Sequence, residues 1–245
     1  PVIADGRIYL ATDNGRLHAV DADNGTTVWT FNAGTNFRTT PAVADGRVFF
    51  GGGDDGTFYA LDAATGQPLW TYPTGDRLTY ASPTVVAGTV YFGTGWGEGD
   101  GGWVYALDAA TGALRWRTFI GPQIFFGPAV AAGTVFAGSY DARRLVALDA
   151  ETGAEKWSLT RERDSFAATP TYADGTVYVG TNDFDTGVGA VLAVDAETGA
   201  VRWEASGHGD ASGSAPVVHG DLVIAGSHGH GWVAAYDRAT GERRW

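Results

Sequence analysis

One phrase of about thirteen residues recurs six times along the chain, and every copy ends in tryptophan. The clearest copy is VYALDAATGALRW, residues 104–116. The final residues of the copies are Trp29, Trp70, Trp116, Trp157, Trp203 and Trp245, which lie 41 to 46 residues apart. A period of about 40 to 45 residues built from short strands is typical of the blades of a β-propeller.

The phrase itself predicts a β-hairpin. Tyr105 and Leu107 alternate with smaller residues, as in a half-buried strand, and an Asp-x-x-Thr-Gly turn follows at residues 108–112. The Asp and Thr side chains can bond the backbone amides of the turn, and Gly supplies the positive φ that closes it. A second recurrent phrase, PAVADGRVFFGG at residues 41–52, places Asp-Gly between two apolar runs and predicts another hairpin. Each repeat therefore predicts four antiparallel strands.

We expect an all-β fold, a β-propeller of six four-stranded antiparallel blades with tryptophan-docking motifs, forming a single domain over residues 1–245. One four-stranded sheet cannot bury both of its faces, whereas six sheets packed around an axis can. We also expect the first and last repeats to close the ring. The expected repeats are residues 1–40, 41–82, 83–127, 128–169, 170–215 and 216–245.

Charge and composition exclude several classes of partner and chemistry. The net charge is −12, and Lys156 is the single lysine. Nucleic acid and anionic membrane surfaces need a concentrated basic face, so the composition argues against both. The chain has no cysteine and therefore no disulfide or thiol chemistry. It also has no methionine, and neither a leader nor a long apolar segment, so we expect a product trimmed from a longer precursor.

The spacing A-x-D-x-x-T-G-x-x-x-W, found at residues 106–116 and 147–157, resembles the tryptophan-docking motif of the pyrroloquinoline-quinone (PQQ)-like propeller repeat family. The resemblance covers the whole chain. It implies that each terminal Trp is buried against the neighbouring blade, so that the six indoles form a girdle around the ring. An aromatic residue that recurs once per unit is also expected where sheets pack, because burial of its ring is strongly stabilising.

The resemblance implies two functional classes. Quinoprotein dehydrogenases of this kind have eight blades and hold PQQ and Ca²⁺ against a pair of adjacent cysteines, whereas this sequence has six repeats and no cysteine. The other class resembles the lipoprotein of outer-membrane barrel assembly and the sensor propellers, whose loops hold partners. We expect a non-catalytic binding or sensor module, periplasmic or extracellular, with no catalytic residues and no cofactor. A PQQ- or metal-dependent oxidoreductase is the alternative.

Binding residues are expected where the repetition stops. The connections between repeats differ in every copy, and the loops at residues 93–103 and 180–190 carry insertions. Variable loops on a repeated frame are the usual location of binding sites. An aromatic plug of the axial hole, and arginines paired with neighbouring carboxylates, are the alternatives to a site that binds a protein or a small molecule. The candidate residues are Phe37, Arg38, Arg77, Tyr80, Trp96, Phe125, Phe126, Arg161 and Arg163.

A metal site is a weaker alternative. His228 and His230 point the same way in an extended segment, and His208 comes from the adjoining connection. Two histidines and a third ligand can bind zinc, although His-x-His pairs are common in glycine-rich loops. Asp183 and Asp185 offer oxygen ligands of the kind that Ca²⁺ prefers, but a solvated turn explains them equally. We therefore expect no metal.

Overall fold

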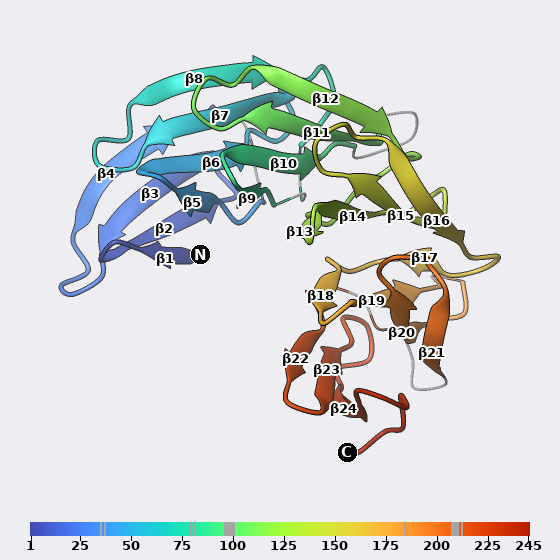
Figure 1. Ribbon diagram of the computed structural model, residues 1–245. Helices are drawn as coiled ribbons and strands as arrows, with labels where there is room; N and C mark the ends of the chain where they lie inside the picture. Colours follow the sequence, from blue (N-terminus) through green and yellow to red (C-terminus); the bar gives the residue numbers. More distant parts are fainter. Residues whose placement is uncertain are drawn as a thin grey trace. The chain divides into compact units, whose positions relative to one another are not determined.

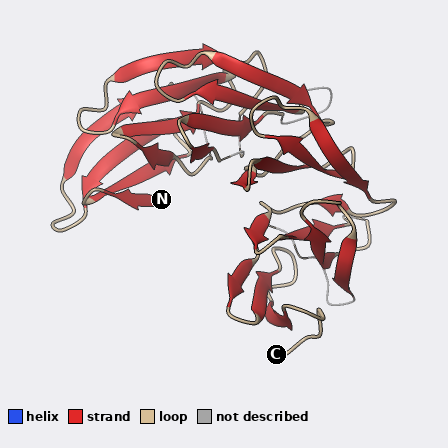
Figure 2. Ribbon diagram, viewed as in Figure 1, coloured by secondary structure: helices blue, strands red, loops and turns tan. Residues whose placement is uncertain are grey.

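The computed structural model describes residues 1–34, 36, 38–78, 80, 82–95, 101–183, 185–206, 211 and 213–245. The elements in this part of the chain are all strands joined by turns and loops (Figures 1 and 2). No helix long and apolar enough to cross a membrane occurs among these residues. The chain forms two compact units, Pro1–Phe119 and Ile120–Trp245.

The first unit contains three antiparallel sheets of four strands each, and within each sheet the strands lie side by side in chain order. Each of the first three repeats is therefore one up-and-down meander, as predicted. The strands are β1 (Val2–Ala4), β2 (Arg7–Thr12), β3 (Arg16–Asp21), β4 (Thr27–Asn32), β5 (Ala42–Ala44), β6 (Arg47–Gly51), β7 (Thr57–Asp62), β8 (Pro68–Pro73), β9 (Thr84–Val86), β10 (Thr89–Gly93), β11 (Trp103–Asp108) and β12 (Leu114–Phe119).

The second unit continues the pattern with three more antiparallel sheets. Its strands are β13 (Ala129–Ala131), β14 (Thr134–Ser139), β15 (Arg144–Asp149), β16 (Glu155–Thr160), β17 (Ser165–Phe166), β18 (Thr171–Ala173), β19 (Thr176–Asn182), β20 (Ala190–Asp195), β21 (Val201–Ser206), β22 (Val217–His219), β23 (Leu222–Gly226) and β24 (Val233–Asp237). β13 to β16 form one sheet, β17 to β21 a second, and β22 to β24 a third.

Two sheets of the second unit depart from the predicted count of four strands. β17 is an additional strand of two residues that pairs with the end of β19. In the last sheet, the expected fourth strand is reduced to a single bridge between Tyr236 and Arg243. In the other sheets the fourth strand continues for three residues beyond its Trp, and the sequence stops at Trp245.

The predicted Asp-x-x-Thr-Gly turn is confirmed. Oδ1 of Asp108 accepts hydrogen bonds from the backbone N–H groups of Ala110 and Thr111, at 3.1 and 3.0 Å, and from the Thr111 hydroxyl at 2.9 Å. Gly112 has a φ of 74°. The strands before and after the turn pair with Ala106 opposite Trp116, and a bulge follows directly after Ala106. A small residue thus lies opposite the large indole.

The tryptophan of one sheet contacts the turn of the next sheet. The indole N–H of Trp29 donates a 3.0 Å hydrogen bond to the carbonyl of Ala63. A Cβ atom added to Gly66 would lie 2.6 Å from the same indole, so glycine is required for this close packing. The equivalent hydrogen bonds join Trp70 to Ala109 at 3.2 Å, Trp157 to Ala196 at 2.9 Å and Trp203 to Arg238 at 2.9 Å.

Trp245 does not fit this arrangement. Its side chain is 57% exposed within the unit to which it belongs. By contrast, Trp116 and Trp203 are 8% and 9% exposed.

Between the sheets, large side chains pack face to face. In the first unit Phe58 of β7 stacks on Phe92 of β10, with ring centroids 4.0 Å apart, and Phe92 stacks on Tyr105 of β11 at 5.2 Å. In the second unit Phe136 of β14 stacks on Tyr172 of β18 at 6.1 Å. In each unit, these aromatic side chains therefore join two neighbouring sheets.

A basic residue precedes the tryptophan in the last four repeats, and it forms an ion pair with the turn aspartate. Arg115 lies 2.8 Å from Asp108, and Val28 and Leu69 occupy the equivalent position in the first two repeats. Hydrogen bonds from Arg115 and then Thr111 lower the pKa of Asp108 from 3.8 to about 2. The other pairs are Lys156 with Asp149, Arg202 with Asp195 and Arg244 with Asp237.

This pairing makes a prediction about acid stability. Because the folded pKa of Asp108 lies below its unfolded value, the contribution of the pair is present above about pH 4 and is lost as the pH falls through about 2. We expect Arg115→Leu, which introduces the residue type of the second repeat, to raise the pKa of Asp108. A carboxyl ¹³C NMR titration measures the pKa of Asp108. Asp62 is the internal control, because the main cause of its lowered pKa is a hydrogen bond from Thr65. An unchanged Asp108 midpoint would show that the arginine is not the cause.

Candidate functional site

The turns and loops of each unit gather at two ends of the strands. At one end, which we call the turn end, the turn between the first two strands of a sheet bonds the turn between the last two. For example, Ala22 N–H donates to the carbonyl of Gly6 at 2.9 Å. At the other end, the loop end, the loop between the second and third strands bonds the connection to the next sheet. Leu78 N–H donates to Gly53 at 2.9 Å in the first unit, and Arg161 N–H to Arg143 at 2.9 Å in the second.

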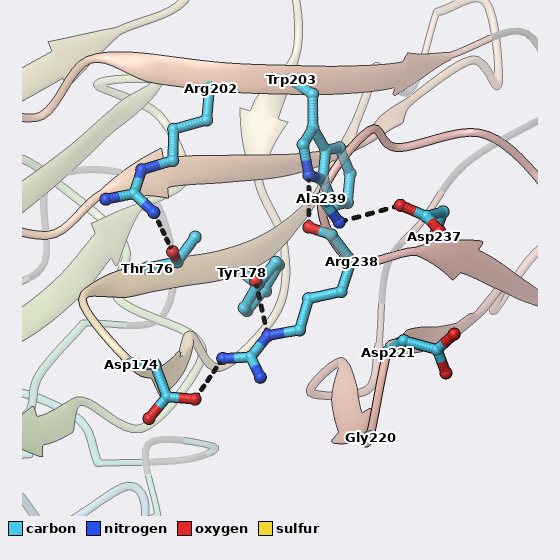
Figure 3. A pocket seen from close by; sticks show the side chains of 10 residues that line it. All are labelled: Asp174, Thr176, Tyr178, Arg202, Trp203, Gly220, Asp221, Asp237, Arg238 and Ala239. Carbon is cyan, nitrogen blue, oxygen red and sulfur yellow. Dashed lines mark hydrogen bonds and ion pairs between the residues drawn. The ribbon is translucent and has the colours of Figure 1, made fainter.

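A pocket of about 680 Å³ lies at the turn end of the second unit and is shown in Figure 3. Arg238 enters it from the last turn, at a position where the other repeats have alanine. Its guanidinium donates to Asp174 at 2.7 Å and to the Tyr178 hydroxyl at 3.2 Å, and these two contacts raise the pKa of Arg238. Arg202 is likewise bonded to Thr176 at 2.6 Å. Because these polar groups pair with one another, we interpret the pocket as part of the packing between β19 and the β22–β24 sheet.

In the first unit, two predicted site residues lie together at the loop end. The guanidinium of Arg38 lies over the ring of Tyr80, 5.5 Å from its centroid, and donates a hydrogen bond to the Tyr80 hydroxyl. It also lies 3.7 Å from a carboxylate oxygen of Asp13. The hydrogen bond from Arg38 to Tyr80 is the main cause that raises the pKa of Arg38. The connections after β4 and β8 are thus joined by a cation–aromatic contact that is open to solvent.

The remaining candidates of the first unit are less informative. Arg77 lies 3.9 Å from Asp54 in the β6–β7 loop, and its side chain is 47% exposed. Phe37 and Trp96 lie outside the described residues.

In the second unit, Phe125 and Phe126 are half-buried in the connection before β13. The ring of Phe125 packs against Tyr140 of the β14–β15 loop, with centroids 5.2 Å apart. Ile124, directly before it, is 1% exposed. Phe125 is therefore anchored on one side and accessible on the other.

Arg161 is held by internal carboxylates. Its guanidinium donates to Asp164 at 2.9 and 3.2 Å and to Glu204 of β21 at two distances of 3.0 Å. Burial alone would lower the pKa of Arg161, but the hydrogen bonds that it donates to Glu204 and Asp164 raise the pKa above its usual value. The side chains of Arg161 and Asp164 are 22% and 13% exposed. Arg161 therefore ties the connection after β16 to β21 and is not free to bind a ligand.

Arg163 behaves differently, although it lies only two residues further along. It is exposed, and its side chain forms no hydrogen bond or ion pair with any residue that the structure describes. It lines three pockets, of about 340, 320 and 270 Å³. Sequence reasoning selected Arg163 but missed Tyr140, Ser165 and Asn182, which line the third pocket with it. The inserted loop at residues 180–190 was the signal that could have indicated Asn182.

Two of the three residues proposed for a metal lie among the described residues. His228 and His230 are exposed in the loop between β23 and β24, where the His230 N–H donates to the Ser227 hydroxyl at 2.8 Å. His208 lies outside the described residues. Among the residues that are described, no three His, Cys, Asp or Glu side chains converge in a way that could hold a metal ion.

Comparison with known proteins extends these observations. The family described as "Outer membrane protein assembly factor BamB" matches residues 1–123 and 100–245. The solved structures that the chain resembles include BamB from Moraxella catarrhalis, with a TM-score of 0.79 and 24% identity over 99% of this chain and 73% of that one. No curated protein matches the chain.

Dehydrogenases share the same fold. A europium-containing methanol dehydrogenase is similar with a TM-score of 0.75 and 18% identity, over 99% of this chain and 67% of that one. The quinohemoprotein alcohol dehydrogenase from Comamonas testosteroni has a TM-score of 0.60 and 17% identity, over 99% of this chain and 65% of its own. At such identities the similarity establishes the fold, and the choice between binding and catalysis depends on the residues of the site.

Proposed function

We propose a binding function from one premise: the chain belongs to the PQQ-like propeller family described as outer membrane protein assembly factor BamB. We infer that it holds a protein partner at its loop ends and performs no chemistry of its own. An assembly factor acts by association with other proteins, and its name places it outside the cytoplasm. We therefore propose an extracytoplasmic location, periplasmic or extracellular, for this chain as well.

The observation that carries this proposal is the contrast between the two ends of the strands. At the turn end, aspartate, threonine and glycine repeat in nearly the same arrangement, and the polar groups bond one another. A surface that is almost the same in every repeat offers little to distinguish one partner from another. The loop end instead differs in every repeat and presents arginine and aromatic side chains, which are enriched among the residues that dominate binding energy.

We define the proposed partner surface unit by unit, by the residues at the loop end of each. Arg161 supports it through its internal ion pairs and does not contact the partner. Phe37 and Trp96 belong to the proposal from the sequence alone. The described residues of the surface are Arg38, Arg77, Tyr80, Phe125, Phe126 and Arg163.

The structural similarity to dehydrogenases leaves a PQQ- or metal-dependent oxidoreductase as the alternative. No group of described residues favours it, because no set of metal-binding side chains converges among them.

Site-specific photocrosslinking in the cell of origin tests the proposal. A photoreactive residue at Arg38 or Phe126 is expected to capture a protein partner, because both positions lie at the loop end. The same residue at Asp23 or Thr111, which are exposed at the turn end, is the matched control and is expected to capture none. Capture from the turn end alone would show that the wrong end was chosen.

Once a partner is captured, substitution measures the contribution of the first unit. Arg38→Glu combined with Tyr80→Ala is expected to weaken binding at least about tenfold, since an arginine paired with an aromatic side chain is a frequent hot spot. The melting temperature should stay near that of the wild type, because the Arg38 side chain is 47% exposed. Isothermal titration calorimetry gives the affinity and calorimetric unfolding gives the control. Unchanged affinity in the double variant would remove the first unit from the proposed surface.

A further inference from the structure

The pocket of about 270 Å³ at the loop end of the second unit is formed by three segments that are fixed to one another. The β14–β15 loop is held by the Tyr140 N–H, which donates to the Gln123 carbonyl at 2.9 Å. In the connection after β16, the carbonyl of Glu162 accepts from the guanidinium of Arg143 at 2.5 Å. The third segment is the loop between β19 and β20, and the end of β19 from which it starts is held by pairing with β17. The residues that line the pocket include Tyr140, Arg143, Arg163, Asn182, Asp183 and Asp185.

Two opposite charges in this pocket are both available to a ligand. Neither the guanidinium of Arg163 nor the carboxylate of Asp185 forms a hydrogen bond or an ion pair with another described residue. Both residues are exposed, and they do not pair with each other. The pocket thus offers a strong donor and a strong acceptor on its wall.

Asn182 supplies an independent observation. It lines the pocket, yet it is only 5% exposed, and its Oδ1 accepts no hydrogen bond from the described part of the chain. A buried amide oxygen without a donor destabilises the folded chain, and a donor on a ligand would remove that cost. A ligand hydroxyl can satisfy an amide in either orientation, because it both donates and accepts.

The charges around the pocket select the kind of ligand. An anion bound to Arg163 would lie near the carboxylates of Asp183 and Asp185, and a cation bound to Asp185 would lie near Arg143 and Arg163. A neutral molecule rich in hydroxyl groups avoids both conflicts, since it can donate to the carboxylates and accept from the guanidinium. The half-buried ring of Tyr140 adds an apolar surface. The volume of the pocket lies just below the usual range for drug-sized ligands, which suits one small ring.

From this combination we infer that the pocket binds a neutral saccharide through a single sugar ring, with Arg163, Asp185 and Asn182 as its polar contacts. The inference does not depend on the proposed protein partner. It uses residues of the second unit, whereas the affinity test above uses Arg38 and Tyr80 of the first. Failure of one proposal is therefore distinguishable from failure of the other.

NMR titration of the ¹⁵N-labelled protein tests the inference. The probes are D-glucose, D-galactose, D-mannose and N-acetyl-D-glucosamine, with L-glutamate and putrescine as the anionic and cationic comparisons. At least one sugar is expected to produce saturable shifts in the backbone amides of residues 140–143, 163–166 and 185–188. Arg163→Gln and Asp185→Asn should each weaken that sugar at least about fivefold, the size expected for one lost hydrogen bond.

Arg16→Gln is the matched control, because Arg16 is an exposed arginine of the first unit and should leave sugar binding unchanged. Three results would overturn the inference. The first is the absence of saturable shifts at these amides with every sugar. The second is tighter binding of glutamate or putrescine at the same amides. The third is sugar binding that survives both substitutions.

Discussion

Trp203→Ala is expected to lower the free energy of unfolding by about 3 to 5 kcal/mol, the range for removal of a large aromatic side chain from a packed interior. Three features of the site produce this effect. The indole is 9% exposed and lies 5.9 Å from the ring of Tyr178. A Cβ atom at Gly241 would lie 2.7 Å from the indole, so the last turn has no side chain that could fill the cavity. The carbonyl of Arg238 also loses its 2.9 Å hydrogen bond from the indole N–H.

Chemical denaturation followed by circular dichroism measures this change. Trp245→Ala is the matched control, since Trp245 occupies the same position of its repeat but is 57% exposed. We expect the control to change stability by less than about 1 kcal/mol, as exposed substitutions usually do. Equal losses in the two variants would mean that burial does not explain the role of the repeated tryptophan.

The hairpins were predictable because their determinants are local. Asp108, Thr111 and Gly112 lie within five residues, and the hydrogen bonds that they form stay inside the turn. The packing of the repeated tryptophan against a neighbouring sheet was expected from repetition, because a large aromatic side chain that recurs once per repeat is expected where sheets pack. Departures arose where contacts are not local. β17 pairs with residues of β19 beyond an intervening strand, and nothing in Ser165–Phe166 distinguishes it from the rest of the connection.

In the candidate site, too, the sequence indicated what depends on residue type and missed what depends on contacts between distant residues. Residue type selected both Arg161 and Arg163, and the sequence could not separate them. Asp164 is close to both in the chain, and the second carboxylate that engages Arg161 is on Glu204, far along the chain. Asn182 was missed for a related reason. Its importance lies in burial without a hydrogen-bond donor, which only the packed structure reveals.

The turn glycines offer a second large effect that isolates the contact between sheets. Gly25 and Gly66 occupy the same position of the Asp-x-x-x-Gly turn in the first two repeats, with φ values of 75° and 72°. A Cβ atom at Gly25 would meet nothing within 4 Å, whereas one at Gly66 would lie 2.6 Å from the indole of Trp29. The backbone conformations of the two glycines are therefore nearly the same. The difference is that an indole packs against Gly66 and nothing packs against Gly25.

Gly25→Ala is expected to cost about 1 to 2 kcal/mol, since alanine is strained at a positive φ. Gly66→Ala carries the same strain and must also displace an indole, and overpacking of this kind adds about 1 to 3 kcal/mol. Denaturation of both variants measures the difference, which is attributable to the Trp29 contact because the two glycines lie in the same unit. If the two variants were equally unstable, backbone strain alone would explain the glycine of every repeat, and the indole would be adaptable. A larger loss at Gly66 would instead establish the turn as a fitted receptor for the tryptophan of the preceding sheet.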